Sequence, residues 1–95
     1  MKIKIFGKDY EFKKIKNFYI DGSKCWGGCR LGVGIYLEKE APKDLQESTL
    51  IHEIIEAINW ELELNLEHNK ITALESGLYQ VLKDNKLIDF SKYIK

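Results

Sequence analysis

The chain has 95 residues, of which 44% are hydrophobic and 32% are charged, and its net charge is zero. A chain of this length is expected to form one domain, residues 1–95, with a small core. No apolar run approaches the length of a membrane span, and residues 1–6 are too short and too alternating for a signal peptide. We therefore expect a cytoplasmic protein with no membrane partner.

The neutral total conceals an uneven distribution of charge. Residues 1–43 carry ten Lys and Arg against five Asp and Glu, whereas residues 44–95 carry five against ten. Two solvated faces that attract each other weakly would explain this pattern. A more specific alternative is an acidic half that favours cations. The lysines of the first half alternate with apolar residues as on an ordinary solvent face, so nucleic-acid binding is not expected.

The first half of the chain is predicted to form strands. Alternating or short apolar runs indicate four of them, at residues 2–6, 10–15, 18–20 and 33–37. The glycine-rich residues 25–34 predict a loop or irregular strand where other atoms approach the backbone closely. Pro42 then marks the change to helices, because the residue before proline resists helix and proline suits a helix start.

Two helices are predicted after Pro42, at about residues 44–64 and 68–84. Their apolar side chains recur at helical spacing: Ile51, Ile54, Ile55, Ile58 and Leu62 on the first, and Ile71, Leu74, Leu78 and Leu82, with Glu75 among them, on the second. The expected fold is α+β: a small N-terminal antiparallel sheet of three or four strands packed on two antiparallel helices. The apolar tail at residues 87–94 should pack back on the core.

The first helix carries the motif H-E-x-x-E at residues 52–56, one residue away from the zinc motif H-E-x-x-H. Residues i and i+4 lie one above the other on a helix, so His52 and Glu56 can share one metal ion. Carboxylate oxygen is an accepted zinc ligand. Glu53 stands where it could take a proton from a metal-activated water.

Two residues of the second helix are candidates for a third ligand. Glu75 falls on the core stripe, where a carboxylate needs a partner such as a metal ion or a metal-bound histidine, unless it reaches solvent at the edge. His68 begins the helix, and it is either an ordinary solvated residue or close to the end of the first helix.

The chain's two cysteines, Cys25 and Cys29, stand in the glycine-rich segment. A disulfide is not expected in a cytosolic chain. A closed zinc site built from these cysteines with His52 and His68 is conceivable, but the spacing fits no common zinc finger. Small residues in a tight loop are the favoured interpretation.

Residues 20–85 resemble the small zincin-like proteins of phages and prophages, which are described as metallopeptidases or as proteins of unknown function. The resemblance rests on the Cys- and Gly-rich segment 25–37, on residues 49–59 and on residues 74–85. It implies His52 as a metal ligand, Glu53 as the general base and Glu56 as the second ligand by its place in the motif. Many such proteins have His where Glu56 stands. Zincin templates offer either His68 or Glu75 as the third ligand.

The sequence thus leads to two functional hypotheses. The first is a phage-type zinc peptidase that hydrolyses amide bonds of a polypeptide substrate with metal-activated water. The alternative is a non-catalytic zincin-like module that keeps a polar cluster in place of the metal site and binds a host or phage protein. In zincins the edge strand before the helix can hold a peptide by strand addition.

Overall fold

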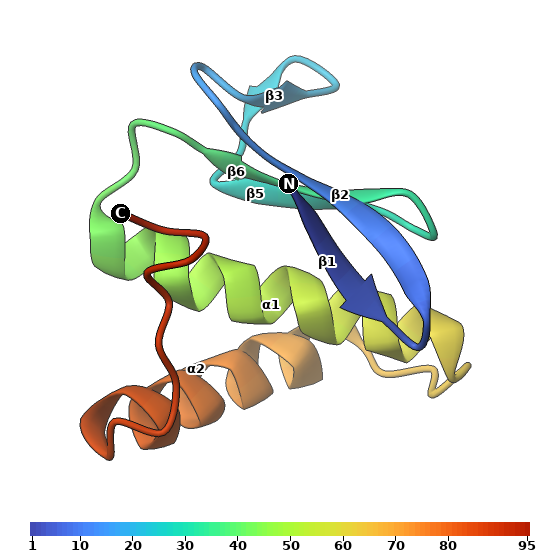
Figure 1. Ribbon diagram of the computed structural model, residues 1–95. Coiled ribbons are helices and arrows are strands. Elements are labelled where there is room, and N and C mark those ends of the chain that lie inside the picture. Colours follow the sequence, from blue (N-terminus) through green and yellow to red (C-terminus); the bar gives the residue numbers. More distant parts are fainter.

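The computed structural model describes residues 1–95 and stacks a small hairpin, a sheet and two helices in layers (Figure 1). The strands are β1 (Lys2–Ile5), β2 (Lys8–Ile15), β3 (Tyr19–Ile20), β4 (Ser23–Lys24), β5 (Gly27–Arg30) and β6 (Gly34–Glu38). The helices are α1 (Lys43–Glu61) and α2 (His68–Asp84). The predicted α+β class is confirmed. Neither helix combines the length and hydropathy needed to span a bilayer.

The main sheet is mixed, which corrects the expectation of a wholly antiparallel sheet. Its strand order is β1-β2-β6-β5, in which β1–β2 and β5–β6 are antiparallel and β2–β6 is parallel. After β2 the chain forms the β3–β4 hairpin. It then re-enters the sheet as strand β5, at the same end at which β2 left it. The following turn brings β6 back between β5 and β2. As a result β5 is left at a free edge of the sheet.

Local backbone chemistry explains the two tight turns of this sheet. Phe6 and Gly7, with φ of 49° and 78°, form a two-residue turn between β1 and β2 whose twist matches that of the strands. Gly32, with φ of 77°, supplies the left-handed residue of the three-residue turn between β5 and β6. The hydroxyl of buried Tyr10 accepts the Gly32 N–H at 3.0 Å and donates to Glu61 at 2.8 Å, so this turn is tied to the end of α1.

A fully buried carboxylate fixes the β3–β4 hairpin above the sheet. Glu38, at the end of β6, accepts the backbone N–H groups of Phe18 at 2.8 Å, Glu40 at 2.9 Å and Asn17 at 3.3 Å. Lys24 of β4 lies 3.6 Å from the same carboxylate. These contacts hold the pKa of Glu38 below its usual range, since each one favours the charged form.

The face that α2 turns to α1 differs from the predicted apolar stripe. Leu74 and Leu78 are 45% and 42% exposed, and Ile71 is the only buried residue of α2. Polar partners on α1 explain the rotation. Tyr79 donates to Glu47 at 2.7 Å, Lys83 donates to the same oxygen at 2.7 Å, and Glu75 pairs with His52. The two antiparallel helices are therefore joined as much by hydrogen bonds as by apolar packing.

The C-terminal tail packs back on the core, as predicted. Phe90 and Ile94 are buried members of the hydrophobic core. Tyr93 meets Phe12 edge to face at 5.4 Å and donates from its hydroxyl to the C=O of Lys2 at 3.2 Å. In Figure 1 this segment rises from the end of α2 past α1 toward the sheet. It closes the layers on the side where α1 begins.

Candidate metal centre

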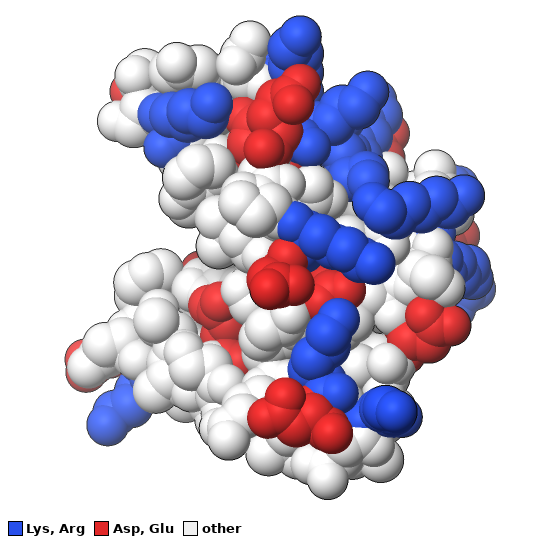
Figure 2. Space-filling view, turned by 90° about the vertical axis from the view of Figure 1, so that its left-hand side faces the viewer, with Lys and Arg blue, Asp and Glu red and all other residues white.

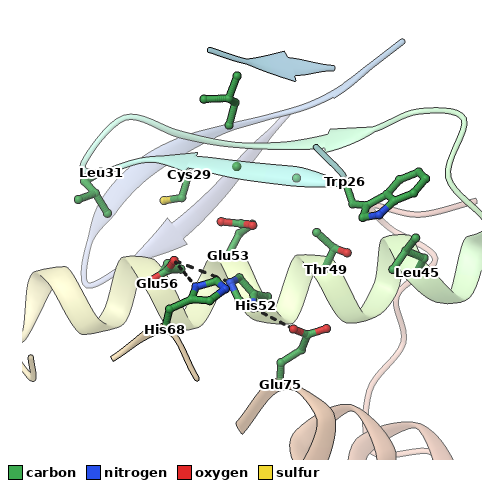
Figure 3. Close-up of a pocket in the computed structure, with 13 residues that line it drawn as sticks. Trp26, Cys29, Leu31, Leu45, Thr49, His52, Glu53, Glu56, His68 and Glu75 are labelled. Atoms are coloured by element: carbon green, nitrogen blue, oxygen red, sulfur yellow. Dashed lines mark hydrogen bonds and ion pairs between the residues drawn. The ribbon is translucent and has the colours of Figure 1, made fainter. Parts of the chain in front are cut away.

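Helix α1 presents the motif residues in two directions. Glu53 points up toward β5, whereas His52 and Glu56 lie on the flank that faces the start of α2 (Figure 3). This follows from the helical repeat, because neighbouring residues are rotated by about 100° and residues four apart nearly coincide. In line with this, Oε2 of Glu56 lies 3.8 Å from Nε2 of His52.

Glu75 of α2 binds the other side of the His52 ring. Its Oε1 lies 2.8 Å from Nδ1 of His52, and the side chains of both residues are largely buried, at 18% and 12% exposure. An ionised carboxylate can only accept, so Nδ1 of His52 carries the hydrogen and donates it. In a neutral ring this leaves the lone pair on Nε2, the nitrogen that lies 3.8 Å from Oε2 of Glu56. A carboxylate that orients a histidine in this way is the usual partner of a metal-ligating histidine.

The connection between the helices brings His68 to the same place. Asn59 of α1 accepts the backbone N–H of Leu66 at 2.9 Å, which holds the connection against α1 two residues before His68. Nδ1 of His68 then lies 4.0 Å from Oε2 of Glu56, and its ring meets that of His52 at 5.1 Å between centroids. The side chain of His68 is exposed at 76%.

Three potential ligand atoms therefore converge. Those of His52, Glu56 and His68 all lie within 4.8 Å of one another, whereas Cys25 and Cys29 are outside this cluster. The four-ligand cysteine–histidine site is thus wrong. Zinc with nitrogen and oxygen ligands at about 2.0–2.2 Å places neighbouring donors a little over ~3 Å apart. The cluster fits such an ion after a small inward movement, which the exposed His68 can make.

The same geometry separates the two candidates for a third ligand. His68 belongs to the cluster of converging atoms, and Glu75 is joined to His52 on the side away from Glu56. Glu75, which was expected to need a partner if it lay on the core stripe, is largely buried and has His52 as that partner. Because Glu75 contacts Nδ1 of His52 directly, its place in the structure suits a residue that orients the His52 ring.

Glu53 is buried without a hydrogen-bond partner. Its carboxyl group faces the cleft, and burial raises its pKa to about 7. The charge of His52 opposes this shift, whereas Glu56 and Glu75 reinforce it. A carboxyl group with a pKa near neutrality can accept and release a proton under physiological conditions.

These residues lie in a cleft of about 640 Å³ between the free edge of β5 and the two helices. Its remaining lining comes from Gly27, Gly28 and Cys29 of β5, from Thr49, and from four apolar side chains, Ile20, Trp26, Leu31 and Leu45. Figure 2 shows the outline of the molecule indented between the sheet half, where Lys and Arg mainly gather, and the helices below. The cleft is therefore open to a large ligand.

Sequence reasoning did not identify the β5 side of this cleft. The tight loop predicted around Cys29 gave no sign that Trp26 and Cys29 line a cleft, because nothing in a glycine-rich segment shows which side chains face a helix. The Cys29 side chain extends from β5 toward α1 in Figure 3, and burial, reinforced by Glu53 and Glu56, raises its pKa to about 12. Cys29 is therefore a neutral thiol rather than a reactive thiolate.

Comparisons of the chain with protein-family models, with curated proteins and with solved structures gave no match.

Proposed function

We propose that this protein is a zinc-dependent peptidase of the small zincin-like type found in phages and prophages. The observation that carries the proposal is the convergence of His52, Glu56 and His68 beside a buried glutamate, Glu53, in an open cleft. The free edge strand β5 along that cleft supports a polypeptide as the substrate. The two free cysteines are compatible with a cytoplasmic location, which is part of the proposal.

In this proposal His52, Glu56 and His68 hold the metal, and Glu75 fixes the ring of His52. A bound zinc ion would supply Lewis acidity, which lowers the pKa of a water molecule and polarises an amide carbonyl group. The set of two histidines and one glutamate is a ligand combination that zinc uses in hydrolases. Glu56 thus takes the place that a second histidine has in H-E-x-x-H.

Glu53 serves as the general base. Its carboxylate accepts the proton of the attacking water and then passes that proton to the amine that leaves as the amide bond breaks. In the metal-free protein burial raises the pKa of Glu53 to about 7. No other acidic residue of the cleft is buried without a partner.

The test is the substitution Glu53→Gln, which keeps the size of the side chain and removes its basicity. We expect the variant to bind zinc as the unmodified protein does and to hydrolyse an unfolded polypeptide such as casein at least about 100-fold more slowly. Mass spectrometry of the products and zinc analysis of both proteins measure the two outcomes. Equal hydrolysis by both proteins would remove Glu53 from the mechanism.

A non-catalytic protein-binding module is the second candidate, and one observation favours it. The hydrogen bond between His52 and Glu75 is complete without any ion, so the polar cluster can stabilise the helix pair by itself. This alternative predicts that a chelator leaves the melting temperature unchanged. The peptidase proposal predicts that zinc raises the melting temperature, because a ligand that binds only the folded state stabilises it.

A further inference from the structure

We propose that two copies of this protein associate through the outer face of α2, with their α2 helices crossing in antiparallel orientation at Gly77. The proposal goes beyond the proposed function, because no residue of this face belongs to the metal centre. A weak, reversible homodimer is the expected state in concentrated solution.

One flank of α2 is apolar and has no partner within the chain. Leu74, Leu78 and Val81 are 45%, 42% and 50% exposed, and their spacing of four and three residues aligns them on one side of the helix. In Figure 1, α2 lies on the side of α1 away from the sheet, and α1 is the only helix or strand that packs extensively against it. Exposed apolar side chains that are grouped rather than scattered indicate a surface that another molecule covers.

Gly77 lies at the centre of this face, between Leu74 and Val81. A Cβ atom at Gly77 would have nothing within 4 Å, so the backbone of α2 is open to a neighbour at this point. Because the distance between packed helices depends on the side chains at their contact, a second helix can approach most closely here. The crossing point of a docked helix is therefore expected at Gly77.

Two residues of opposite charge flank Gly77 at equal distances. Lys70 stands seven residues before Gly77 and Asp84 seven residues after it. Seven residues make nearly two full turns, so both side chains lie on the same face as Gly77, each about 10 Å from it along the axis. Both residues are exposed, and neither takes part in an ion pair within the chain.

This arrangement of charge favours a second copy of the chain in antiparallel orientation. In such a pair the start of one helix lies beside the end of the other, so Lys70 of each copy meets Asp84 of the partner subunit. A parallel pair would place Lys70 beside Lys70 and Asp84 beside Asp84, which is unfavourable. The face is thus complementary to itself, as a contact across a two-fold axis requires. The net charge of zero adds no long-range repulsion between the copies.

Pairing through this face leaves the metal centre accessible. Glu75, which contacts His52, follows Leu74 and is rotated from it by about 100° around the helix. The residues of the face do not line the cleft. The homodimer should therefore form equally with zinc and with a chelator, and a dimer that dissociates in chelator would overturn the proposal.

The size of the face predicts a weak dimer. Helix α2 has 17 residues and is about 25 Å long. A single pair of helices of this length covers less than the roughly 800 Å² per partner of a standard stable complex. We therefore expect a dissociation constant in the range of about 10–100 µM.

Sedimentation equilibrium of the full chain over about 5–500 µM brackets the expected dissociation constant and measures the association. We expect the mean mass to rise with concentration from 11.1 kDa, the mass of one chain, toward twice that value. A protein that stays monomeric at the highest concentration would overturn the proposal, and a different protein would then have to cover the face.

Charge reversal tests the antiparallel arrangement. Lys70→Glu and Asp84→Lys should each weaken the homodimer by about tenfold, because two attractive contacts become repulsive. An equimolar mixture of the two variants should associate again, since each substituted residue then meets the opposite substitution and the remaining Lys70 meets the remaining Asp84. A mixture as dissociated as its two components would overturn this arrangement.

Removal of an apolar side chain tests the face itself. Leu74→Ser should weaken the homodimer by about tenfold or more, because the change removes apolar contact area from both copies. Val33→Ser is the matched control, since Val33 is 47% exposed but lies in the turn between β5 and β6. Circular dichroism checks that both variants fold. An equal loss of association in the two variants would contradict the assignment to α2.

Discussion

Three glutamates within one cleft have three different environments. Glu53 is buried and has no hydrogen-bond partner, Glu75 accepts a hydrogen bond from His52, and Glu56 lies partly exposed between the two histidines. The same side-chain chemistry is therefore suited to three roles, as base, as orienting group and as ligand. Environment rather than residue type makes this distinction.

The raised pKa of Glu53 has a consequence for the stability of the metal-free protein. Because its pKa is about 7 in the folded state and about 4.3 in an unfolded chain, the folded state binds this proton more tightly. The resulting stabilisation is complete below pH ~4.3 and is lost as the pH rises through about 7. We expect the free energy of unfolding to fall between pH 5 and pH 8 and to fall less in Glu53→Gln.

Urea unfolding at both pH values measures this difference. Glu38 and Glu47, whose pKa values are lowered, do not interfere, because their contributions change only below the unfolded pKa of about 4.3. Identical pH dependence in the two proteins would show that Glu53 is not the buried, unpaired group described above.

Substitution of Glu75 distinguishes an orienting residue from a ligand. Glu75→Gln keeps the shape of the side chain but no longer offers a charged acceptor to His52. We expect zinc affinity to decrease by about 10–100-fold, the usual effect of changing such a partner. His68→Ala removes a direct ligand and should decrease affinity further. A larger loss in Glu75→Gln, measured by competition with a chromophoric chelator, would reverse the two assignments.

The sequence predicted the part of the candidate site that depends on helical spacing alone. His52, Glu53 and Glu56 follow from one motif on one helix. The choice between His68 and Glu75 depended on how the connection folds, and the hydrogen bond between Asn59 and Leu66 that settles its path has no signal in the spacing. Trp26 was missed because the side-chain directions in a glycine-rich strand depend on its pairing register.

Strand β5 packs closely against α1 because Gly27 has no side chain. Gly27→Ala would drive a Cβ atom into Thr49 of α1, so we expect a loss of about 1–3 kcal/mol in the free energy of unfolding. Thr49→Ser removes the methyl group concerned, and the double variant should recover much of the loss. Gly77 of α2 has nothing within 4 Å of its missing Cβ, and Gly77→Ala should instead stabilise by about 1 kcal/mol.

Denaturant unfolding of the four variants tests this packing. A Gly27→Ala protein as stable as the unmodified chain would mean that β5 and α1 are farther apart than described. Equal losses in the single and double variants would mean that Thr49 is not the residue in contact.

The elements themselves were largely predictable, and their pairing was less so. Helix α2 was expected at the residues where it occurs, and α1 ends three residues before its predicted end. The parallel pairing of β2 with β6 could not be predicted, because it depends on where the β5–β6 hairpin returns to the sheet. The face of α2 was misassigned because Tyr79 and Glu75 found polar partners on α1, which outweighed the burial of Leu74 and Leu78.

On the scale of the whole molecule, the cleft exists because two layers meet at a free edge. The sheet ends at β5, and α1 packs beneath it. Helix α2 is hydrogen-bonded to α1 on the side of α1 that is away from the sheet (Figure 1). The layers leave an open space that both the histidines and the edge strand face. The basic residues gather mainly on the sheet half, so the acidic residues of the cleft dominate its local charge (Figure 2).

The zinc content of the protein purified without chelator is the most direct test of the proposed metal centre. We expect close to one zinc ion per chain in the unmodified protein and in Glu53→Gln, and only traces in His52→Ala. Circular dichroism should show that the His52 variant still folds, since loss of the fold would also release the metal. An unmodified protein that contains only traces of zinc, and that takes up none when zinc is added, would contradict the metal centre.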